Sequence, residues 1–396
     1  MVEERIEGPR GCTKADLPEL IDLVNAVFRP DGGQNMLTDY PLVYRDQNLP
    51  NIRLLKVDGR LASEVPFCPW PVEHEGCRFT LGIISPTATH PDHRHKSFGL
   101  RCLNNCIACM EQQGIDLSVL WTMVPTFKFY THAGYQAVCD QGLNYPSDRK
   151  DVPRFADGGE TVVTYDPKTR RFLPEIMAMH ASDAFGIVRD AEQTATLLAL
   201  GGLTTLLALR RGTPTAYLCF SGSLNKPGFI EAGGDAGSLE TLLHHALKTF
   251  CAGPTKRGDG RGMIRAYVQS CPTVLGDMLS RKMPDRRVPS GDHMMVRINN
   301  IPGFLRRIAP WIERRRDEAC GGFSLGISDA NQTVSLDFSA RRLTIGSDRR
   351  PQHLELSRLE LTSAIFGVHP ERPYDPPEPL VSLFPFYFPI SVLDRS

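Results

Sequence analysis

Residues 87–99 read TATHPDHRHKSFG and join a run of strand-forming residues to a predicted helix that begins near Gly99. In such a turn the first helical N–H groups have no partner inside the helix, and the helix dipole places roughly half a positive charge at this end. Arg94, His95 and Lys96 add cationic donors, and Gly99 permits close approach of the backbone. The turn therefore favours the binding of a pyrophosphate group.

The strand before this turn ends at a proline. Pro91 lacks a backbone N–H, so it cannot continue a strand ladder and is expected to detach the chain from its neighbour. An unpaired edge at Thr87, Ala88 and Thr89 could hydrogen-bond an extended ligand that carries amides, such as pantetheine. Taken alone, such a turn is more often a solvated, charged loop, so the prediction depends on a second motif.

The second motif follows another predicted strand, Leu117–Trp121, and reads FYTHAGY at residues 129–135. Together the two motifs resemble the GNAT superfamily of N-acetyltransferases, whose pyrophosphate loop usually reads Gln/Arg-x-x-Gly-x-Gly/Ala. The matching positions here are Arg94, Ser97 and Gly99, with serine where the family prefers glycine. The later family motif, a tyrosine four residues before a Gly-aromatic pair, is matched by Tyr130.

This resemblance implies direct transfer of an acetyl group from acetyl-CoA, as co-substrate, to an amine, without an acyl-enzyme. Tyr130 would protonate the departing thiolate, since a phenol of pKa ~10 is a competent donor. A backbone N–H near Thr89 would polarise the thioester carbonyl. The residues expected to bind acetyl-CoA are Thr87, Ala88, Thr89, Arg94, His95, Lys96, Ser97, Phe98 and Gly99.

The length of 396 residues predicts two or three domains. We place them at residues 1–150, 151–290 and 291–396. The predicted fold class is α+β, with two tandem GNAT-like mixed α/β domains and a C-terminal domain like a sterol carrier protein. The second domain is expected to be degenerate, because its strand-to-helix turn, Glu231–Asp235, is acidic and would repel phosphates.

Local patterns predict several elements of the first and third domains. Thr13 is expected to be the N-cap of an amphipathic helix that runs through Leu17 and Phe28. A hairpin is expected over residues 52–67, with its turn at Asp58-Gly59. In the third domain, alternating runs at residues 323–328, 333–338 and 343–347 predict a small antiparallel sheet, with Val334, Leu336 and Phe338 on its inner face.

This order of domains resembles the Eis (enhanced intracellular survival) acetyltransferases. The resemblance implies a homo-oligomer, a trimer or a hexamer. It also implies that the terminal carboxylate, here that of Ser396, acts as the base, with Asp394 and Glu64 as alternatives. The apolar ending of the chain favours a docked tail over a frayed one.

The acceptor is expected to enter beside the first helix and the loop after it. Asp31, Asp39 and Tyr40 lie there, with Glu64 nearby, and carboxylates and aromatic faces suit a cationic amine. An ordinary polar loop is the alternative reading. Polyamines and aminoglycosides are the acceptors that the Eis resemblance suggests.

Composition narrows the class of protein. A formal net charge of zero argues against nucleic acid or anionic membrane as a partner. No segment reads as a signal peptide or a membrane span, and 11 scattered cysteines favour a reducing cytoplasm. We expect no metal site, because Cys102, Cys106 and Cys109 have the spacing of one buried helix face.

Two other functions stay open. The chain could be a lipid-binding carrier with a vestigial acetyltransferase domain, and a filled core beneath the third sheet would argue against this. Alternatively, the acceptor could be a protein lysine, which an open, shallow acceptor groove would favour.

Overall fold

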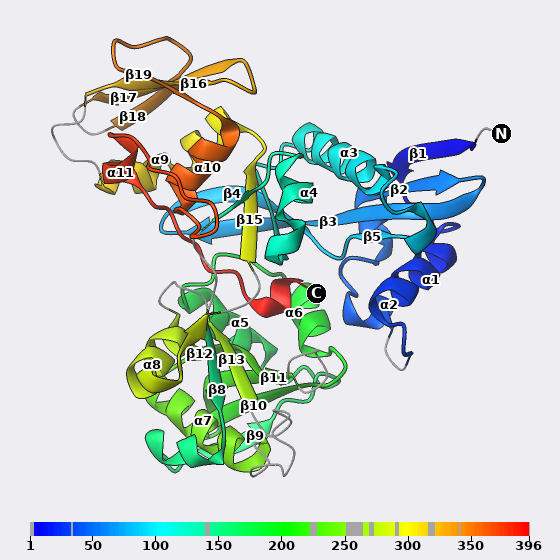
Figure 1. The fold of residues 1–396 in the computed structure, drawn as a ribbon. Helices are drawn as coiled ribbons and strands as arrows, with labels where there is room; N and C mark the ends of the chain where they lie inside the picture. The colour runs from blue at the N-terminus through cyan, green and yellow to red at the C-terminus, as the bar shows by residue number, and fades with distance from the viewer. Residues whose placement is uncertain are drawn as a thin grey trace. The chain divides into compact units, whose positions relative to one another are not determined.

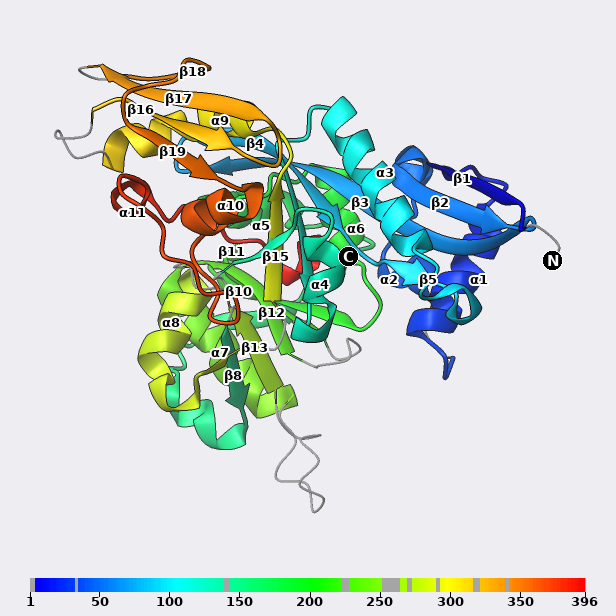
Figure 2. The same ribbon diagram turned by 45° about the horizontal axis from the view of Figure 1, so that its top comes forward.

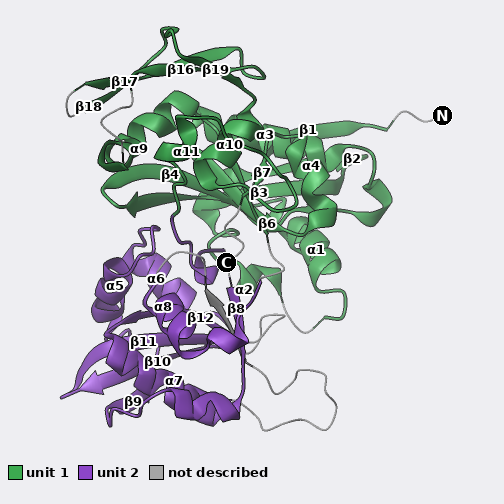
Figure 3. Ribbon diagram, turned by 60° about the vertical axis from the view of Figure 1, so that its left-hand side comes forward, with its two compact units in different colours: residues 1–140, 292–387 green, residues 141–291, 388–396 purple. Residues whose placement is uncertain are grey.

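The computed structural model describes residues 4–32, 35–138, 143–221, 228–250, 264–268, 273–289, 293–315, 321–339 and 342–395. By compactness the chain divides into two units (Figure 3). Unit 1 comprises Met1–Asp140 and Asp292–Tyr387, and unit 2 comprises Gln141–Gly291 and Phe388–Ser396. The first and third predicted segments thus share one unit. Among the described residues, no helix is both long and apolar enough to cross a bilayer.

The main sheet of unit 1 follows the order β1-β2-β3-β4-β6-β15-β7, with β5 paired to β3 (Figure 1). The predicted hairpin is confirmed as β2 and β3, and its turn residues Asp58 and Gly59 have φ of 50° and 79°. The strands are β1 (Ile6–Gly11), β2 (Ile52–Val57), β3 (Arg60–His74), β4 (Cys77–Ile84), β5 (Ala88–Thr89), β6 (Leu117–Thr122), β7 (Gln136–Ala137) and β15 (His293–Ile298).

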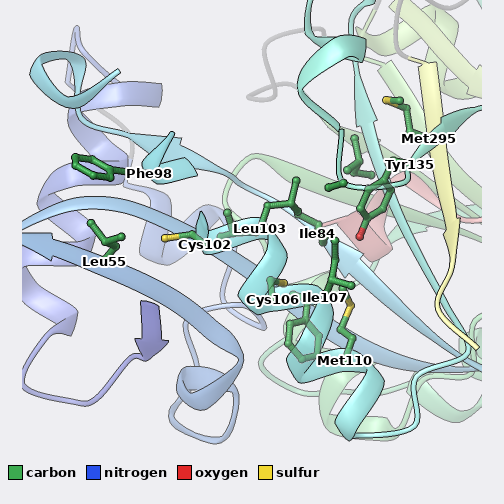
Figure 4. Close-up of a cluster of buried hydrophobic side chains, with 14 of the residues drawn as sticks. Leu55, Ile84, Phe98, Cys102, Leu103, Cys106, Ile107, Met110, Tyr135 and Met295 are labelled. Carbon is green, nitrogen blue, oxygen red and sulfur yellow. The ribbon is translucent and has the colours of Figure 1, made fainter. Parts of the chain in front are cut away.

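Helices cover both faces of this sheet: α3 (Phe98–Gln112) lies on one face, and α1 (Leu17–Phe28) and α2 (Met36–Asp39) lie on the other (Figure 1). Figure 4 shows the buried side of α3, where Cys102, Cys106 and Met110 follow one another along the helix. A short helix, α4 (Phe127–Thr131), precedes β7.

The predicted N-cap of the first helix, Thr13, is wrong. Asp16 is the N-cap, and its carboxylate accepts hydrogen bonds from the Thr13 N–H (3.0 Å) and hydroxyl (2.7 Å). Pro18 stands in the first turn, where a missing N–H costs nothing, so the helix begins directly before it.

The third segment contributes to two sheets. Its first strand, β15, lies between β6 and β7 in the main sheet, a pairing that chain order does not reveal. The second sheet has the order β18-β17-β16-β19 and lies beside α9 and α10 (Figure 2). The elements are α9 (Ile301–Arg315), β16 (Phe323–Ile327), β17 (Gln332–Ser339), β18 (Arg342–Gly346), β19 (His353–Leu356), α10 (Arg358–Phe366) and α11 (Leu380–Leu383).

The prediction for this second sheet needs one correction. Its three expected strands are present, but β19 pairs parallel to β16, so the sheet is mixed rather than antiparallel. After β17 and β18 the chain crosses the sheet and pairs with β16 as β19, running in the same direction. The alternation of residues within one strand does not predict the direction of such a pairing. Val334 and Leu336 are buried as expected, and Phe338 is half-buried.

Unit 2 contains a sheet of order β14-β8-β13-β12-β11-β10-β9. The parallel pair β12 and β13 flanks α7, just as the parallel pair β4 and β6 flanks α3 in unit 1. The elements are β8 (Leu143–Ser147), β9 (Thr161–Thr164), α5 (Leu173–Ser182), α6 (Ala191–Leu198), β10 (Leu203–Arg210), β11 (Thr213–Ser221), β12 (Gly228–Gly234), α7 (Ala236–Phe250), β13 (Ile264–Val268), α8 (Val274–Lys282) and β14 (Val288–Pro289).

Candidate functional site

The main sheet of unit 1 opens between β4 and β6. The two strands pair in parallel from Leu81↔Leu117 to Ile83↔Val119, and beyond this point the chain leaves β6 and pairs with β3 as β5. The break falls at Ser85-Pro86, upstream of Pro91, which we had expected to cause it. Pro86 has no N–H to donate and so interrupts the ladder at this position. Thr87–Thr89 therefore lie on an edge that β6 does not cover.

The predicted pyrophosphate loop follows β5 directly. A 3₁₀ turn, Pro91–His93, leads to Arg94, His95, Lys96 and Ser97, all exposed, and α3 begins at Phe98. His95 and Ser97 have φ of 63° and 61°, in the left-handed region that glycine adopts most readily. Ser97 therefore takes a backbone conformation that suits the glycine preferred at this position.

Gly99 is required by its surroundings. A Cβ at this position would lie 3.0 Å from the Thr89 Oγ1 and 3.4 Å from the Phe129 ring. The Thr89 hydroxyl in turn lies 2.8 Å from the Ser63 hydroxyl. The first turn of α3 thus sits directly against β5 and α4, and Gly99 makes this approach possible. Ser63 had no signal in the sequence, because only strand pairing places it here.

Tyr130 lies on α4 and is held by the turn that follows. Its carbonyl accepts hydrogen bonds from the N–H groups of Ala133 (2.9 Å) and Tyr135 (3.2 Å), and Gly134 makes the reversal with φ of 84°. The Tyr130 side chain is hydrogen-bonded to Thr87. Burial raises the pKa of the Tyr130 phenol, and the Glu64 charge acts in the same direction, against the Thr87 hydrogen bond. The phenol therefore keeps its proton at neutral pH.

Glu64 is fully buried in the middle of β3. Its neighbours across the sheet are Leu54 on β2 and Ala88 on β5. Neither carboxylate oxygen has a hydrogen-bond partner of good geometry among the described residues, although the Ala88 N–H lies close enough to affect the carboxylate. Burial raises the pKa of Glu64 well above its usual range, and the Ala88 N–H opposes this only in part. The sequence predicts Glu64 near the acceptor loop and names it as an alternative base.

The other acceptor candidates are Asp31, Asp39 and Tyr40. Asp31 is exposed, and Asp39 pairs with Arg29 (Nη2 to Oδ2 2.6 Å), so its charge is already compensated. Tyr40 is half-buried against the cluster beneath α1. Within the described part of the chain, no hydrogen bond or ion pair joins Asp31 or Asp39 to Tyr130 or Glu64.

The two predicted bases near the C-terminus have different outcomes. Ser396 lies outside the described residues. Asp394 is buried in unit 2, where its Oδ1 accepts from the Arg189 Nε at 2.6 Å. Arg189 also binds both oxygens of Glu231, at 3.0 and 2.6 Å. Asp394 is therefore committed to an ion pair within its own unit.

The strand-to-helix turn of unit 2 holds carboxylates where unit 1 holds its basic loop. Glu160 accepts hydrogen bonds from Ser238 (2.6 Å) and Thr241 (2.7 Å) in the first turns of α7. Asp235 accepts the Ser238 N–H at 2.9 Å. These anions occupy the positive end of the helix and disfavour a phosphate there.

The cysteines of α3 have a packing role. Cys102 and Cys106 belong to the buried cluster beneath α3, and burial raises the pKa of Cys102 to about 12. The described residues contain no group of three side chains arranged to hold a metal ion.

Comparison with known proteins agrees with this geometry. Residues 9–138 match the family model described as acetyltransferase (GNAT) domain. Among curated proteins, none matches the chain in sequence. Three similar solved structures follow, each with a fold that spans nearly the whole chain.

A conserved protein of Enterococcus faecalis V583, described as a probable N-acyltransferase, is 16% identical with a TM-score of 0.69, covering 93% of this chain and 91% of that one. A GCN5-related N-acetyltransferase of Anabaena variabilis is 14% identical with a TM-score of 0.66, covering 92% and 90%. Eis1 of Mycobacterium abscessus is 12% identical with a TM-score of 0.59, covering 92% and 90%.

The family match covers the split strands, the basic turn and Tyr130. Residues 9–138 are a GNAT acetyltransferase domain. The chain therefore contains an acetyltransferase domain of the GNAT type, a family that uses acetyl-CoA as its co-substrate.

Proposed function

We propose that the protein transfers an acetyl group from acetyl-CoA to a primary amine of a small cationic acceptor, a polyamine or an aminoglycoside. The observation that carries this proposal is the opening of the sheet at Ile84. The Thr87–Thr89 edge begins just beyond this point, the basic loop follows it directly, and Tyr130 is hydrogen-bonded to Thr87.

The residues of unit 1 take complementary roles in this proposal. The loop from Arg94 to Gly99 binds the pyrophosphate through helical N–H groups and the guanidinium. Edge amides of Thr87–Thr89 hold the pantetheine and polarise the thioester carbonyl. After the amine attacks and the C–S bond breaks, Tyr130 gives its proton to the thiolate and recovers one from the new amide nitrogen. Its raised pKa keeps that proton in place beforehand.

Support for a small acceptor comes from the burial of the acidic group beside the site. Glu64 is 0% exposed and is enclosed by residues of the cluster beneath α1. A protein lysine on a folded partner would need an open groove. A single amine on a flexible small molecule can enter a narrow opening.

The lipid-carrier alternative is weakened by the packing of the third segment. Phe304 on α9 lies 5.7 Å from Phe366 and 6.2 Å from Phe386 between ring centroids, and Trp311 lies 5.0 Å from Phe386. Phe304 also lies 5.5 Å from Phe79 on β4, so these rings fill the space between α9 and the main sheet. That residues 291–396 form a domain like a sterol carrier protein remains our proposal.

The element order of unit 2 supports a second, degenerate GNAT-like domain, because its parallel strand pair flanks a helix as in unit 1. Glu160 and Asp235 at α7 explain why that domain would not take acetyl-CoA. Assembly as a trimer or hexamer is proposed from the Eis resemblance alone.

The test is a direct assay of transfer. Purified protein is mixed with acetyl-CoA and a panel of polyamines, aminoglycosides and a lysine peptide. Thiol release is followed, and the products are identified by mass. Acetylated small amines support the proposal. Acetylation of the peptide alone would replace it with protein-lysine transfer. Binding of acetyl-CoA without transfer to any amine would refute it.

A further inference from the structure

The helix that carries Tyr130 is too short to fix its own position. α4 comprises only Phe127–Thr131, 5 residues, and its N-cap, Thr126, makes no side-chain hydrogen bond to the first turn. Because the first turn of a helix is costly to form, a helix of this length owes its stability to tertiary contacts. The orientation of the Tyr130 phenol therefore depends on the groups that pack against the two ends of α4.

The first end of α4 contacts two histidines of the third segment. The buried Phe127 ring lies 5.5 Å from the His293 ring and 5.4 Å from the His369 ring between centroids, edge to face in both cases. His369 Nδ1 accepts the Glu371 N–H at 3.0 Å. The His369 proton is therefore on Nε2, which donates to His293 Nδ1 at 3.0 Å. The two imidazoles thus hold one another in fixed orientations against Phe127.

The other end of α4 contacts Arg297 on β15. Its Nε donates to the Ala133 carbonyl at 3.1 Å, and the Ala133 N–H donates to the Tyr130 carbonyl at 2.9 Å. Arg297 is itself held in place, because Nη1 donates to Asn299 Oδ1 at 2.8 Å and Nη2 lies 2.9 Å from Glu111 Oε1. The guanidinium is therefore joined to Tyr130 through a single residue.

Both contacts come from one face of β15. Side chains alternate along a strand, so His293, Met295 and Arg297 point to the same side. Met295 packs in the same buried cluster as Phe127, and β15 lies beside α4 in both ribbon views (Figures 1 and 2). One strand of the third segment thus contacts the chain on both sides of Tyr130.

We propose that His293 and Arg297 are positioning residues for acetyl transfer, which hold α4 so that the Tyr130 phenol points at the departing thiolate. This inference rests on the proposed function, in which Tyr130 is the acid. Proton donation requires hydrogen-bond geometry, and a misplacement of about 1 Å can cost about 100-fold in rate. The third segment then contributes to the acetyltransferase site, although the family match ends at residue 138.

The test removes each contact in the wild type and again in Tyr130→Phe. His293→Leu removes the ring beside Phe127, and Arg297→Met removes the hydrogen bond to Ala133. Turnover is measured by thiol release with spermidine or kanamycin as the acceptor, and acetyl-CoA affinity by calorimetry. A residue that acts through the phenol can cost no more than the phenol contributes, so its effect should disappear once the phenol is gone.

Each variant has a matched control. Glu111→Gln removes the charge opposite Arg297 Nη2 but leaves the Nε bond to Ala133 in place. His74→Leu removes another largely buried histidine of the same sheet, at the last residue of β3, whose ring lies 5.9 Å from that of Phe386. Both controls should turn over as the wild type does.

We expect His293→Leu and Arg297→Met each to lower turnover by about fivefold to tenfold at unchanged acetyl-CoA affinity, because Tyr130→Phe itself costs roughly tenfold. In the Tyr130→Phe background each should change turnover less than about twofold. Unchanged acetyl-CoA affinity shows that the fold is intact. His293 is only half-buried, so His293→Leu decides the matter where Arg297→Met does not fold.

Three results would overturn the inference. Equal losses in both backgrounds would make the two contacts purely structural, and wild-type turnover in both single variants would leave them without a role. Wild-type turnover in Tyr130→Phe would remove the group that they position, while amine transfer itself stands. A wild type that acetylates neither acceptor would instead overturn the proposed function.

Discussion

Arg189 Nε lies 2.6 Å from Asp394 Oδ1, and this bond ties the last described residues of the chain to the body of unit 2. Both side chains are buried, and Arg189 also neutralises Glu231. Tyr217 donates to the same Glu231 at 2.9 Å. The Arg189 guanidinium therefore compensates both the Asp394 carboxylate of the tail and the Glu231 carboxylate.

Replacing that cation should destabilise unit 2. Arg189→Met leaves Glu231 and Asp394 buried without a counter-charge, which costs about 3–5 kcal/mol of unfolding free energy. Urea unfolding measures this loss. Arg170→Met, which removes an exposed pair with Glu192, is the control and should change little. Equal stability of the two variants would mean that the buried network contributes nothing to the fold.

Tyr130→Phe should lower turnover by roughly tenfold or more with little effect on acetyl-CoA affinity, because it removes the proton donor but keeps the ring. Initial rates of thiol release measure this. Tyr135→Phe is the control. Tyr135 is the last residue of the same motif, and its buried hydroxyl lies 2.7 Å from the Ser118 hydroxyl. That variant should lose about 1 kcal/mol of stability and keep its rate. An unchanged rate in Tyr130→Phe excludes the acid role.

Arg94→Ala should weaken acetyl-CoA binding by about tenfold, since a charged hydrogen bond to phosphate contributes about 1.5 kcal/mol or more. Calorimetric titration measures the affinity. Arg101→Ala, which removes another exposed arginine further along α3, should bind as the wild type does. Similar losses in both variants would point to general charge attraction rather than a site at the loop.

Ser97→Gly should stabilise the loop, because Ser97 has φ of 61° and glycine adopts this region at about 1 kcal/mol less cost. We also expect acetyl-CoA to bind at least as tightly when the hydroxymethyl group is absent. Thermal melting and calorimetry measure the two effects. Weaker binding in Ser97→Gly would show that the hydroxyl itself contacts the phosphate.

His369 should make unit 1 sensitive to acid. Burial, with the neighbouring His293 at 3.0 Å, lowers the pKa of His369 to about 4 from its usual 6.5. The unfolded chain then binds more protons than the folded one between these values, so stability falls as pH drops from about 6.5 towards 4. The loss reaches at most about 3 kcal/mol.

Urea unfolding at a series of pH values checks this loss, and His369→Gln should flatten the profile between the two values. A variant profile parallel to that of the wild type would place the acid sensitivity elsewhere.

Sequence patterns were sufficient for most local elements. The amphipathic spacing in Leu17–Phe28, the Asp58-Gly59 turn and the alternation in residues 333–338 each predicted an element that the structure contains. These elements depend on residues that are neighbours along the chain, so they can be predicted without knowledge of the fold. The basic turn and Tyr130 were found for the same reason, because each belongs to a short motif of fixed spacing along the chain.

Pairing between distant segments was decided only by the tertiary structure. The position of β15 in the first sheet, the parallel alignment of β19 and the orientation of Glu64 each depend on which strand lies alongside. A one-residue change of register would turn Glu64 to the other face, and local propensity does not distinguish the two registers. The sequence therefore identified an acetyltransferase domain. The strand register decided that Glu64 is buried on the face of the sheet that α1 covers.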